Sequence, residues 1–189
     1  MYLTIYIGNL ILGIIFFAFV LKKGLNFISA IKIFLISLIF NFFLRGLLTL
    51  LNFFTWFYNP IGRIILNDFN YFLYYSATRF WFDFLASLLL GFFFGGLFFI
   101  INLIFKKRLL SNEEFIIFPV NFIIAGWPFN FFLPVLVLLI VFFVFFGKIL
   151  LGKEKKERIS AKNYYFLSSV LLNLLNIIFL PKLNFWRFG

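Results

Sequence analysis

The chain contains neither cysteine nor histidine, and it has only six acidic residues. The missing cysteines exclude disulfides and thiol nucleophiles. The two absences together exclude zinc sites of the usual kind, histidine-ligated haem and the common proton shuttle at neutral pH. With so few carboxylates, acid–base catalysis has few candidate groups. We therefore expect no metal and no cofactor, and we favour a protein that is not catalytic on its own.

Apolar and aromatic side chains are in excess. The chain is 65% hydrophobic and has 36 phenylalanines among its 189 residues. Soluble domains are about 45–50% apolar. Several stretches here lack charge over about 18 residues or more, which is long enough to cross a hydrocarbon core about 30 Å thick. The composition predicts an all-α integral membrane protein that forms a single polytopic transmembrane domain over residues 1–189.

Six apolar segments account for this pattern as membrane spans. They run over about Leu3–Leu21, Ile33–Phe57, Phe84–Phe105, Phe115–Trp127, Phe129–Phe146 and Tyr164–Leu180. The first has no basic region before it and no small-residue cleavage site, so we expect it to be retained. The fourth and fifth meet at Gly126-Trp127-Pro128, which predicts a tight turn. The fourth is short and contains Pro119 and Asn121, so a re-entrant segment is the alternative.

The basic residues orient these spans. Six spans place three Lys-rich loops on one side, and the positive-inside rule makes that side the cytoplasm or an organelle matrix. These loops hold Lys22, Lys23 and Lys32, then Lys106, Lys107 and Arg108, then Lys148, Lys153, Lys155, Lys156, Arg158 and Lys162. Both termini then lie outside, whereas five spans would put the third loop on the wrong side.

The net charge of +11 needs no nucleic acid to explain it. It follows from the loop topology and from attraction to anionic lipid headgroups, and no soluble basic face is long enough to bind nucleic acid. We expect the partners to be the bilayer and other membrane subunits. The membrane is a bacterial or archaeal cytoplasmic membrane or a mitochondrial inner membrane.

A polar stretch separates the second span from the third. It runs from Tyr58 to Asp83 and contains both aspartates of the chain, Asp68 and Asp83. Its apolar residues can share one helical face, with the charged residues and asparagines on the other. An amphipathic helix over residues 61–82 that lies on the outer membrane surface fits this pattern.

Arg45 lies near the middle of the second span and is the only charge well inside any predicted span. A guanidinium at that depth costs about 2.5–3.5 kcal/mol on insertion scales, and such residues are functional candidates by default. Arg45 shares a helical face with Ser37, Asn41, Thr49 and roughly Asn52,. This intramembrane polar stripe indicates a cavity or a proton or substrate path. The structural alternative is an arginine that binds backbone carbonyls or a neighbouring subunit, or that snorkels to the surface.

The sequence places no acid at the depth of Arg45. Asp83 is the nearest and is expected near the outer surface, so Asp83 and Asp68 are its possible acidic partners. Paired-carboxylate chemistry would need these two aspartates to meet, which their spacing does not require. Glu113 and Glu114 follow Ser111-Asn112 and are typical of the first turn of a capped helix.

Small residues indicate where the third span packs. Gly91, Gly95 and Gly96 form a face that lets another helix approach closely,. They do not form a phosphate loop, because they lie inside a predicted helix and no Lys-Ser/Thr pair follows. Ser168 and Ser169 in the last span have no base nearby and are expected to form interhelical hydrogen bonds.

A series of landmarks extends from the third span to the last. It comprises Gly91 and Gly95-Gly96, the basic end Phe105–Leu110, Asn112–Glu114, Gly126-Trp127, Pro134 and the loop Lys148–Lys162. In this order and spacing, the stretch from about Asn67 to Leu172 resembles the membrane core of the type IV prepilin peptidases. These are membrane-embedded aspartyl proteases that trim pilin leader peptides. The resemblance implies a polytopic helical fold with the same sidedness.

The catalytic residues that the resemblance implies are not in place. Where the family has a Gly-x-Gly-Asp segment, this chain reads Ile-Phe-Pro-Val at residues 117–120. Where the family's first aspartate precedes an Ile-Pro turn, this chain has Asn59-Pro60 and then Asn67-Asp68. The cysteine-bearing cytoplasmic module of many members is also missing. Because such a protease needs both aspartates to activate water, the resemblance implies the scaffold and argues against the reaction.

Two interpretations from different classes follow. The first is a protein on a prepilin-peptidase-like scaffold without peptidase chemistry. The second is an integral subunit of a larger respiratory or ATP-synthase-type complex, encoded by an organelle or an AT-rich genome, that contributes packing, lipid binding or a proton path. A transporter is a third interpretation, indicated only by the broken helices around Pro119 and Gly126–Pro128.

Overall fold

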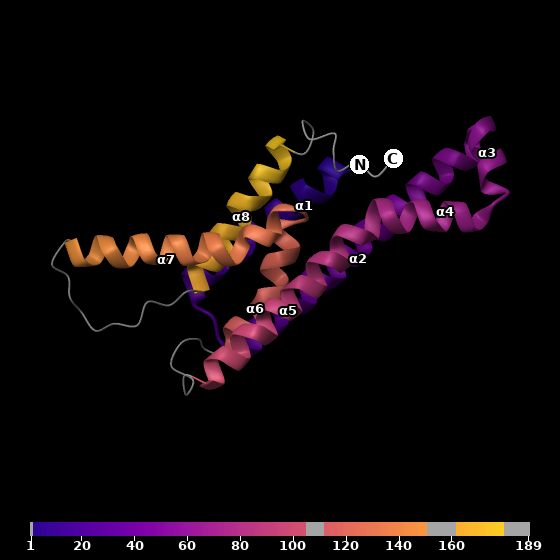
Figure 1. Ribbon diagram of the computed structural model, residues 1–189. Helices are drawn as coiled ribbons and strands as arrows, with labels where there is room; N and C mark the ends of the chain where they lie inside the picture. Colours follow the sequence, from indigo (N-terminus) through magenta and orange to yellow (C-terminus); the bar gives the residue numbers. More distant parts are fainter. Residues whose placement is uncertain (1, 105–111, 151–161, 180–189) are drawn as a thin grey trace.

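The computed structural model describes residues 2–104, 112–150 and 162–179, and within these ranges every regular element is helical (Figure 1). The elements are α1 (Tyr2–Lys23), α2 (Phe27–Tyr58), α3 (Pro60–Leu66), α4 (Phe69–Ser76), the π-helix η1 (Ala77–Trp81), α5 (Phe82–Ile104), α6 (Asn112–Ala125), the 3-10 helix η2 (Phe129–Phe132), α7 (Leu133–Leu150) and α8 (Lys162–Phe179).

Three helical stretches among the described residues are long and apolar enough to cross a membrane: Leu3–Lys23, Phe27–Tyr58 and Phe69–Ile104. Two further apolar helices, Phe129–Val144 and Asn163–Phe179, are shorter. Large apolar side chains are exposed along α1, α2, α5 and α7, as contact with lipid tails requires. The fold is thus all-helical and consistent with an integral membrane protein. The number of spans and their orientation stay predictions.

The long helix α2 has clear local signals at both ends. Asn26 and Ser29 form a capping box, in which Asn26 Oδ1 accepts from the Ser29 amide at 2.7 Å and Ser29 Oγ accepts from the Asn26 amide at 2.9 Å,. At the other end, the side chain of Asn59 caps α3. A Cβ at Gly62 would lie 2.4 Å from the carbonyl oxygen of Trp56. Only glycine therefore allows α3 to fold back so tightly on α2.

The segment after α3 differs from the predicted surface helix. Residues 69–82 do not form a separate amphipathic element, because α4 continues through η1 into α5 as one helical stretch from Phe69 to Ile104. This stretch runs antiparallel to α2 (Figure 1). The stretch begins at the N-cap Asp68, about fifteen residues before the predicted start of the third span at Phe84. The aromatic side chains of this segment pack on α2, as the Trp56 and Phe72 rings do at 5.4 Å.

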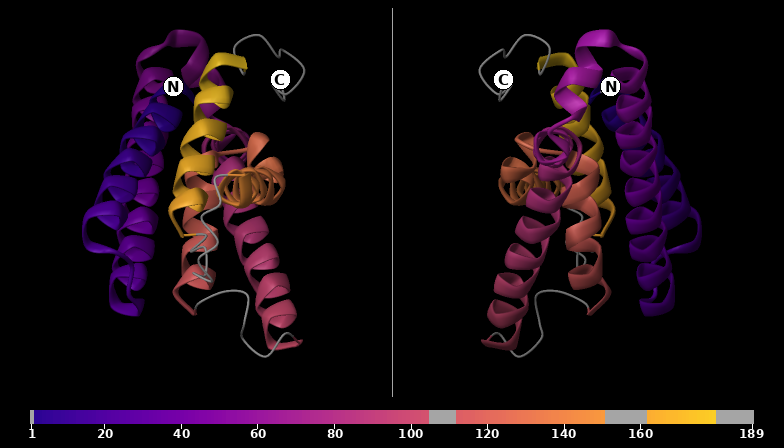
Figure 2. Two further views of the ribbon diagram at one scale, coloured as in Figure 1. Left: turned by 90° about the vertical axis from the view of Figure 1, so that its left-hand side faces the viewer. Right: turned by 90° about the vertical axis from the view of Figure 1, so that its right-hand side faces the viewer.

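The helix α6 forms the centre of the fold. Every residue from Ile117 to Gly126 is buried, between α2 on one side and α5 and α8 on the other (Figure 2). At 14 residues, α6 is about 21 Å long,, and it ends inside the bundle. After it, α7 projects crosswise to the other long helices (Figures 1 and 2). Whether residues 115–127 cross the membrane or re-enter it stays a prediction.

Candidate functional site

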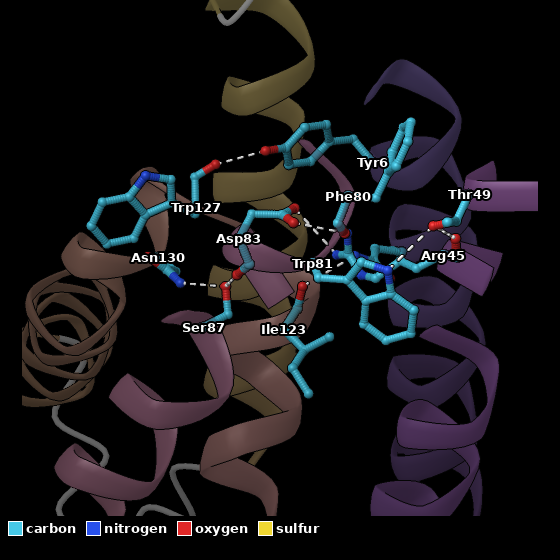
Figure 3. Close-up of polar contacts among 11 residues, drawn as sticks. Tyr6, Arg45, Thr49, Phe80, Trp81, Asp83, Ser87, Ile123, Trp127 and Asn130 are labelled. Carbon is cyan, nitrogen blue, oxygen red and sulfur yellow. Dashed lines mark hydrogen bonds and ion pairs between the residues drawn. The ribbon is translucent and has the colours of Figure 1, made fainter. Parts of the chain in front are cut away.

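The candidate site is an ion pair between α2 and the start of α5 (Figure 3). The guanidinium of Arg45 donates from Nη1 to Asp83 Oδ1 at 2.8 Å and from Nη2 to Asp83 Oδ2 at 3.2 Å. The two residues are 1% and 8% exposed, so the protein itself surrounds both charges. Bidentate geometry of this kind fixes both side chains as well as neutralising them.

The structure corrects the expected position of Asp83. The sequence predicted that Asp83 opens a span near the outer surface and that no acid shares the depth of Arg45. Because the helical stretch begins near Phe69, Asp83 is well inside it and meets Arg45 across the antiparallel packing. Asp68 does not approach Arg45; it caps α4, where its Oδ1 accepts from the Tyr71 amide at 3.3 Å.

The π-helix η1 lies directly before Asp83 and supplies further contacts to Arg45. Nη1 of Arg45 also donates to the carbonyl oxygen of Phe80, the residue that η1 buries. A π-helix alters the i−4 hydrogen-bond ladder, and such elements are frequent at functional sites. The guanidinium also lies over the ring of Phe84 at 5.2 Å, where the face of the ring attracts the positive charge.

One turn further along α2, Thr49 connects this helix with η1. Its Oγ1 donates to the carbonyl oxygen of Arg45 at 2.9 Å and accepts from Trp81 Nε1 at 3.2 Å (Figure 3). On the other side of the ion pair, Ser87 Oγ donates to the carbonyl oxygen of Asp83 at 2.6 Å and accepts from Asn130 Nδ2 at 2.8 Å. The ion pair is therefore part of a longer polar arrangement.

We call this arrangement the polar seam. Its α2 members are Ser37, Asn41, Arg45, Thr49 and Asn52, and its other members are Ser76, Asp83, Ser87 and Asn130. All are buried except Thr49, which is half-buried. The four polar stripe residues that the sequence predicted, Asn41, Arg45, Thr49 and Asn52, thus do share one face of α2 that turns into the protein.

The antiparallel packing of α2 and the Phe69–Ile104 stretch sets which seam residues lie at the same height along the two helices. Asn52 lies seven residues after Arg45, and Ser76 lies seven residues before Asp83, so the two stand at one level. Asn41 and Ser87 lie four residues from the ion pair on its other side, where α6 packs against both α2 and α5. The contact between Trp56 and Phe72, eleven residues from the ion pair in each helix, shows that this register holds.

Many polar atoms of the seam have no hydrogen-bond partner within the protein. They are Ser37 Oγ, Asn41 Oδ1, Arg45 Nε, Asn52 Nδ2, Ser76 Oγ and Asn130 Oδ1. Buried polar atoms are normally paired with protein groups or with ordered water. Six of the ten buried side-chain atoms without a partner among the described residues belong to the seam, and the other four are Asn9 Oδ1, Ser168 Oγ, Asn173 Oδ1 and Asn176 Oδ1.

The described carboxylates are not brought together. Asp68 and Asp83 lie fifteen residues apart along nearly continuous helix, about 22 Å,. Glu114 is buried near Tyr165, at the start of α6, whereas Trp127 beyond the end of α6 contacts Phe82. Asp83 and Glu114 therefore lie near opposite ends of α6. Among the described residues, no group of three metal-ligating side chains is found either.

A second polar cluster satisfies the buried C-terminal end of α6. Asn9 of α1 donates to the carbonyl oxygen of Ile123 at 3.2 Å, and Tyr6 donates to that of Trp127 at 2.7 Å. From α8, Asn173 donates to the carbonyl oxygen of Ile124, and Asn176 donates to those of Ala125 at 2.7 Å and Gly126 at 3.0 Å. A helix end in an apolar interior needs such donors.

Sequence reasoning missed this cluster. Asn9, Asn173 and Asn176 are asparagines within otherwise apolar spans, and their position in the predicted spans is the one signal that marked them. Of the predicted serines, Ser169 donates to Asn121 Oδ1 at 3.0 Å across α6 and α8, which is an interhelical hydrogen bond. The Oγ of Ser168 has no partner within the protein.

The three glycines of α5 differ in their surroundings. A Cβ at Gly91 would lie 2.5 Å from Pro119 Cα of α6, and one at Gly95 would lie 3.4 Å from Phe118 Cβ. Nothing lies within 4 Å of such an atom at Gly96. Gly91 and Gly95 thus form the face on which α6 packs, and Gly96 is outside it.

Comparison of the chain with known protein families, with curated protein sequences and with solved structures finds no match.

Proposed function

We propose that this chain is a non-catalytic integral membrane protein that works as a subunit of a larger membrane assembly. The observation that carries the proposal is the state of Asp83, the one aspartate buried in the core of the described structure. Two hydrogen bonds from Arg45 occupy both of its carboxylate oxygens. Among the described residues no second carboxylate lies beside it, so the paired-carboxylate arrangement that activates water in aspartyl proteases is not formed,.

The surface of α7 supports the assembly part of the proposal. Beyond Val137 the described side chains of α7 are exposed or half-exposed, among them Leu138, Phe142, Phe143 and Phe146. The helix projects crosswise from the bundle (Figure 1). A neighbouring membrane subunit that covers α7 would bury its aromatic rings and fix its direction.

The prepilin-peptidase-like scaffold is the second candidate. It is favoured by the contact of Gly91 and Gly95 with Phe118 and Pro119, because residues 117–120 stand where that family has its Gly-x-Gly-Asp segment. In this proposal the chain keeps the packing of the family and not its chemistry. The six-span topology, the cytoplasmic or matrix side of the Lys-rich loops and binding to anionic headgroups belong to the same proposal.

The first test is the native mass of the chain extracted in mild detergent, with every co-migrating chain identified by mass spectrometry. We expect stoichiometric membrane partners, and we expect Arg45→Ala to lose them while the chain still inserts. A chain that runs alone near 22.5 kDa plus its detergent belt would contradict assembly.

A cleavage assay tests the non-catalytic part separately. The purified chain is incubated with a prepilin substrate in detergent, with an active prepilin peptidase as the positive control. We expect the leader peptide to stay intact with this chain. Cleavage that Asp83→Asn abolishes would overturn the proposal and assign a catalytic role to that aspartate.

A further inference from the structure

We propose that the polar seam is a hydrated proton path across the membrane, in which Asp83 takes up and releases the proton and Arg45 is its counter-ion. This function goes beyond membership of an assembly and depends on different observations. It is carried by the length of the seam, by its unpartnered polar atoms and by the placement of the ion pair within it.

The seam is long in comparison with the hydrocarbon core of a bilayer. Ser37 and Asn52 are fifteen residues apart on α2, or about 22 Å along its axis,. The hydrocarbon core of a bilayer is about 30 Å thick. Polar groups recur on this face at Ser37, Asn41, Arg45, Thr49 and Asn52, and the apolar Leu48 is buried beside the half-buried Thr49.

The unpartnered atoms indicate hydration. Ser37 Oγ, Asn41 Oδ1 and Arg45 Nε succeed one another along one face of α2, and none has a partner within the protein. Past the ion pair, Asn52 Nδ2 and Ser76 Oγ stand at one level and also lack partners. Leaving such groups without water costs the free energy of the hydrogen bonds that they lose. The series contains both donors and acceptors, which water molecules can bridge from one turn to the next.

The ion pair selects the proton as the transported species. A guanidinium in the middle of the seam repels metal cations and hydronium alike, and the adjacent carboxylate repels anions. Unlike a metal ion, however, a proton can bond covalently to a carboxylate oxygen and neutralise it. Asp83 is also the acid that the described structure places in the seam, and intramembrane carboxylates commonly relay protons. Thr49 and Ser87, which flank the ion pair, bind through hydroxyl groups that both donate and accept, as proton transfer along hydrogen bonds requires.

The transfer balances without any other reactant. A hydronium ion in the seam gives its proton to a carboxylate oxygen of Asp83 and becomes water, and the ion pair with Arg45 opens. The neutral acid then gives the proton to a water molecule on the far side of the pair. The carboxylate is restored and pairs with Arg45 again.

The absence of native cysteine allows a direct test of hydration. Single substitutions Ser37→Cys and Ser76→Cys place nearly isosteric thiols in the seam, and Ile39→Cys serves as the matched control on the exposed face of α2. In proteoliposomes, we expect a small water-soluble methanethiosulfonate reagent to modify both seam cysteines and not Ile39→Cys. Seam cysteines that react no faster than Ile39→Cys would overturn the proposal.

Proton flux is measured in the same vesicles, with an entrapped pH dye and a potassium gradient clamped by valinomycin. We expect the wild-type chain to acidify the lumen faster than protein-free vesicles do. Asn41→Leu, which keeps the side-chain volume, should reduce the rate to that of protein-free vesicles, as should Asp83→Asn.

The control for Asn41→Leu is Thr55→Val on the exposed part of α2. Each wild-type side chain bonds the carbonyl oxygen four residues before it, so both variants lose the same kind of helix contact. We expect Thr55→Val to keep wild-type flux. Wild-type flux equal to that of protein-free vesicles, or unchanged flux in Asn41→Leu, would overturn the proposal even if the seam is hydrated. Neither result depends on whether the chain has partners in the cell.

Discussion

At the scale of single residues, the strongest constraint is the burial of two opposite charges. Removing Arg45 and Asp83 from water is costly, and their mutual attraction offsets this cost only because hydrogen bonds to Phe80 and within the pair complete the site,. A buried pair of this kind contributes little net stability compared with apolar residues of equal size. It is much more costly to lose one partner than both.

This asymmetry predicts the behaviour of two variants. Arg45→Leu leaves the Asp83 carboxylate buried without a counter-ion, so we expect it to reduce the free energy of unfolding by about 3–5 kcal/mol. The double variant Arg45→Leu/Asp83→Leu removes both charges and should lose clearly less. Unfolding in mixed micelles measures the free energy of unfolding of the wild-type chain and of both variants. Equal losses in the single and double variants would show that the charges do not interact in the folded protein.

At the scale of elements, the polar stripe of α2 and the capped end of α6 illustrate what can and cannot be predicted from the sequence. The stripe on α2 was predictable, because Ser37, Asn41 and Arg45 recur every four residues in an apolar run. The capping of α6 was not, because an asparagine inside an apolar helix carries no local signal of the carbonyl group that it will bind. The depth of Asp83 was hidden for a similar reason: the tyrosines and charges of residues 58–83 mask a helix that begins near Phe69.

The capping asparagines should therefore be essential to stability. Asn176→Leu would leave the buried carbonyl oxygens of Ala125 and Gly126 without this donor. The Gly126 oxygen keeps the Asn130 amide as a donor at 2.9 Å, so we expect a loss of about 1–3 kcal/mol, chiefly from the Ala125 carbonyl. Asn70→Leu on the exposed face of α4 is the control and should change the unfolding free energy little. A thermal unfolding series in detergent compares them, and similar stability of the two variants would argue against the capping role.

The glycine face of α5 leads to a prediction about packing. Gly91→Ala forces a Cβ to within 2.5 Å of the Pro119 backbone, and overpacking of this kind costs about 1–3 kcal/mol. Gly96→Ala meets open space and should be neutral or stabilising, since alanine restricts the unfolded chain. Both variants can be compared by the midpoint of thermal unfolding. A stable Gly91→Ala protein would mean that α6 does not approach α5 as closely as described.

At the scale of the whole molecule, composition was sufficient to predict an all-helical membrane protein, and it could not determine how many helices cross. The sidedness of the Lys-rich loops does not decide the question either. Two full crossings by α6 and α7, or none, return the chain to the same side. The two topologies differ in where the turn between α6 and α7 lies relative to the membrane. That position depends on tertiary contacts, which no local sequence pattern encodes.

Phe131 in that turn region allows the two topologies to be distinguished. Its side chain is 54% exposed. Its ring lies 6.3 Å from that of Phe94, a residue of α5 that is eleven positions after Asp83. If α6 ends within the membrane, Phe131→Cys faces lipid, and a membrane-impermeant maleimide added to intact cells should not label it. Asn67→Cys, at the predicted outer end, should be labelled. Lys22→Cys should be labelled only after permeabilisation. Labelling of Phe131→Cys as fast as Asn67→Cys would instead place the turn outside and support six full spans.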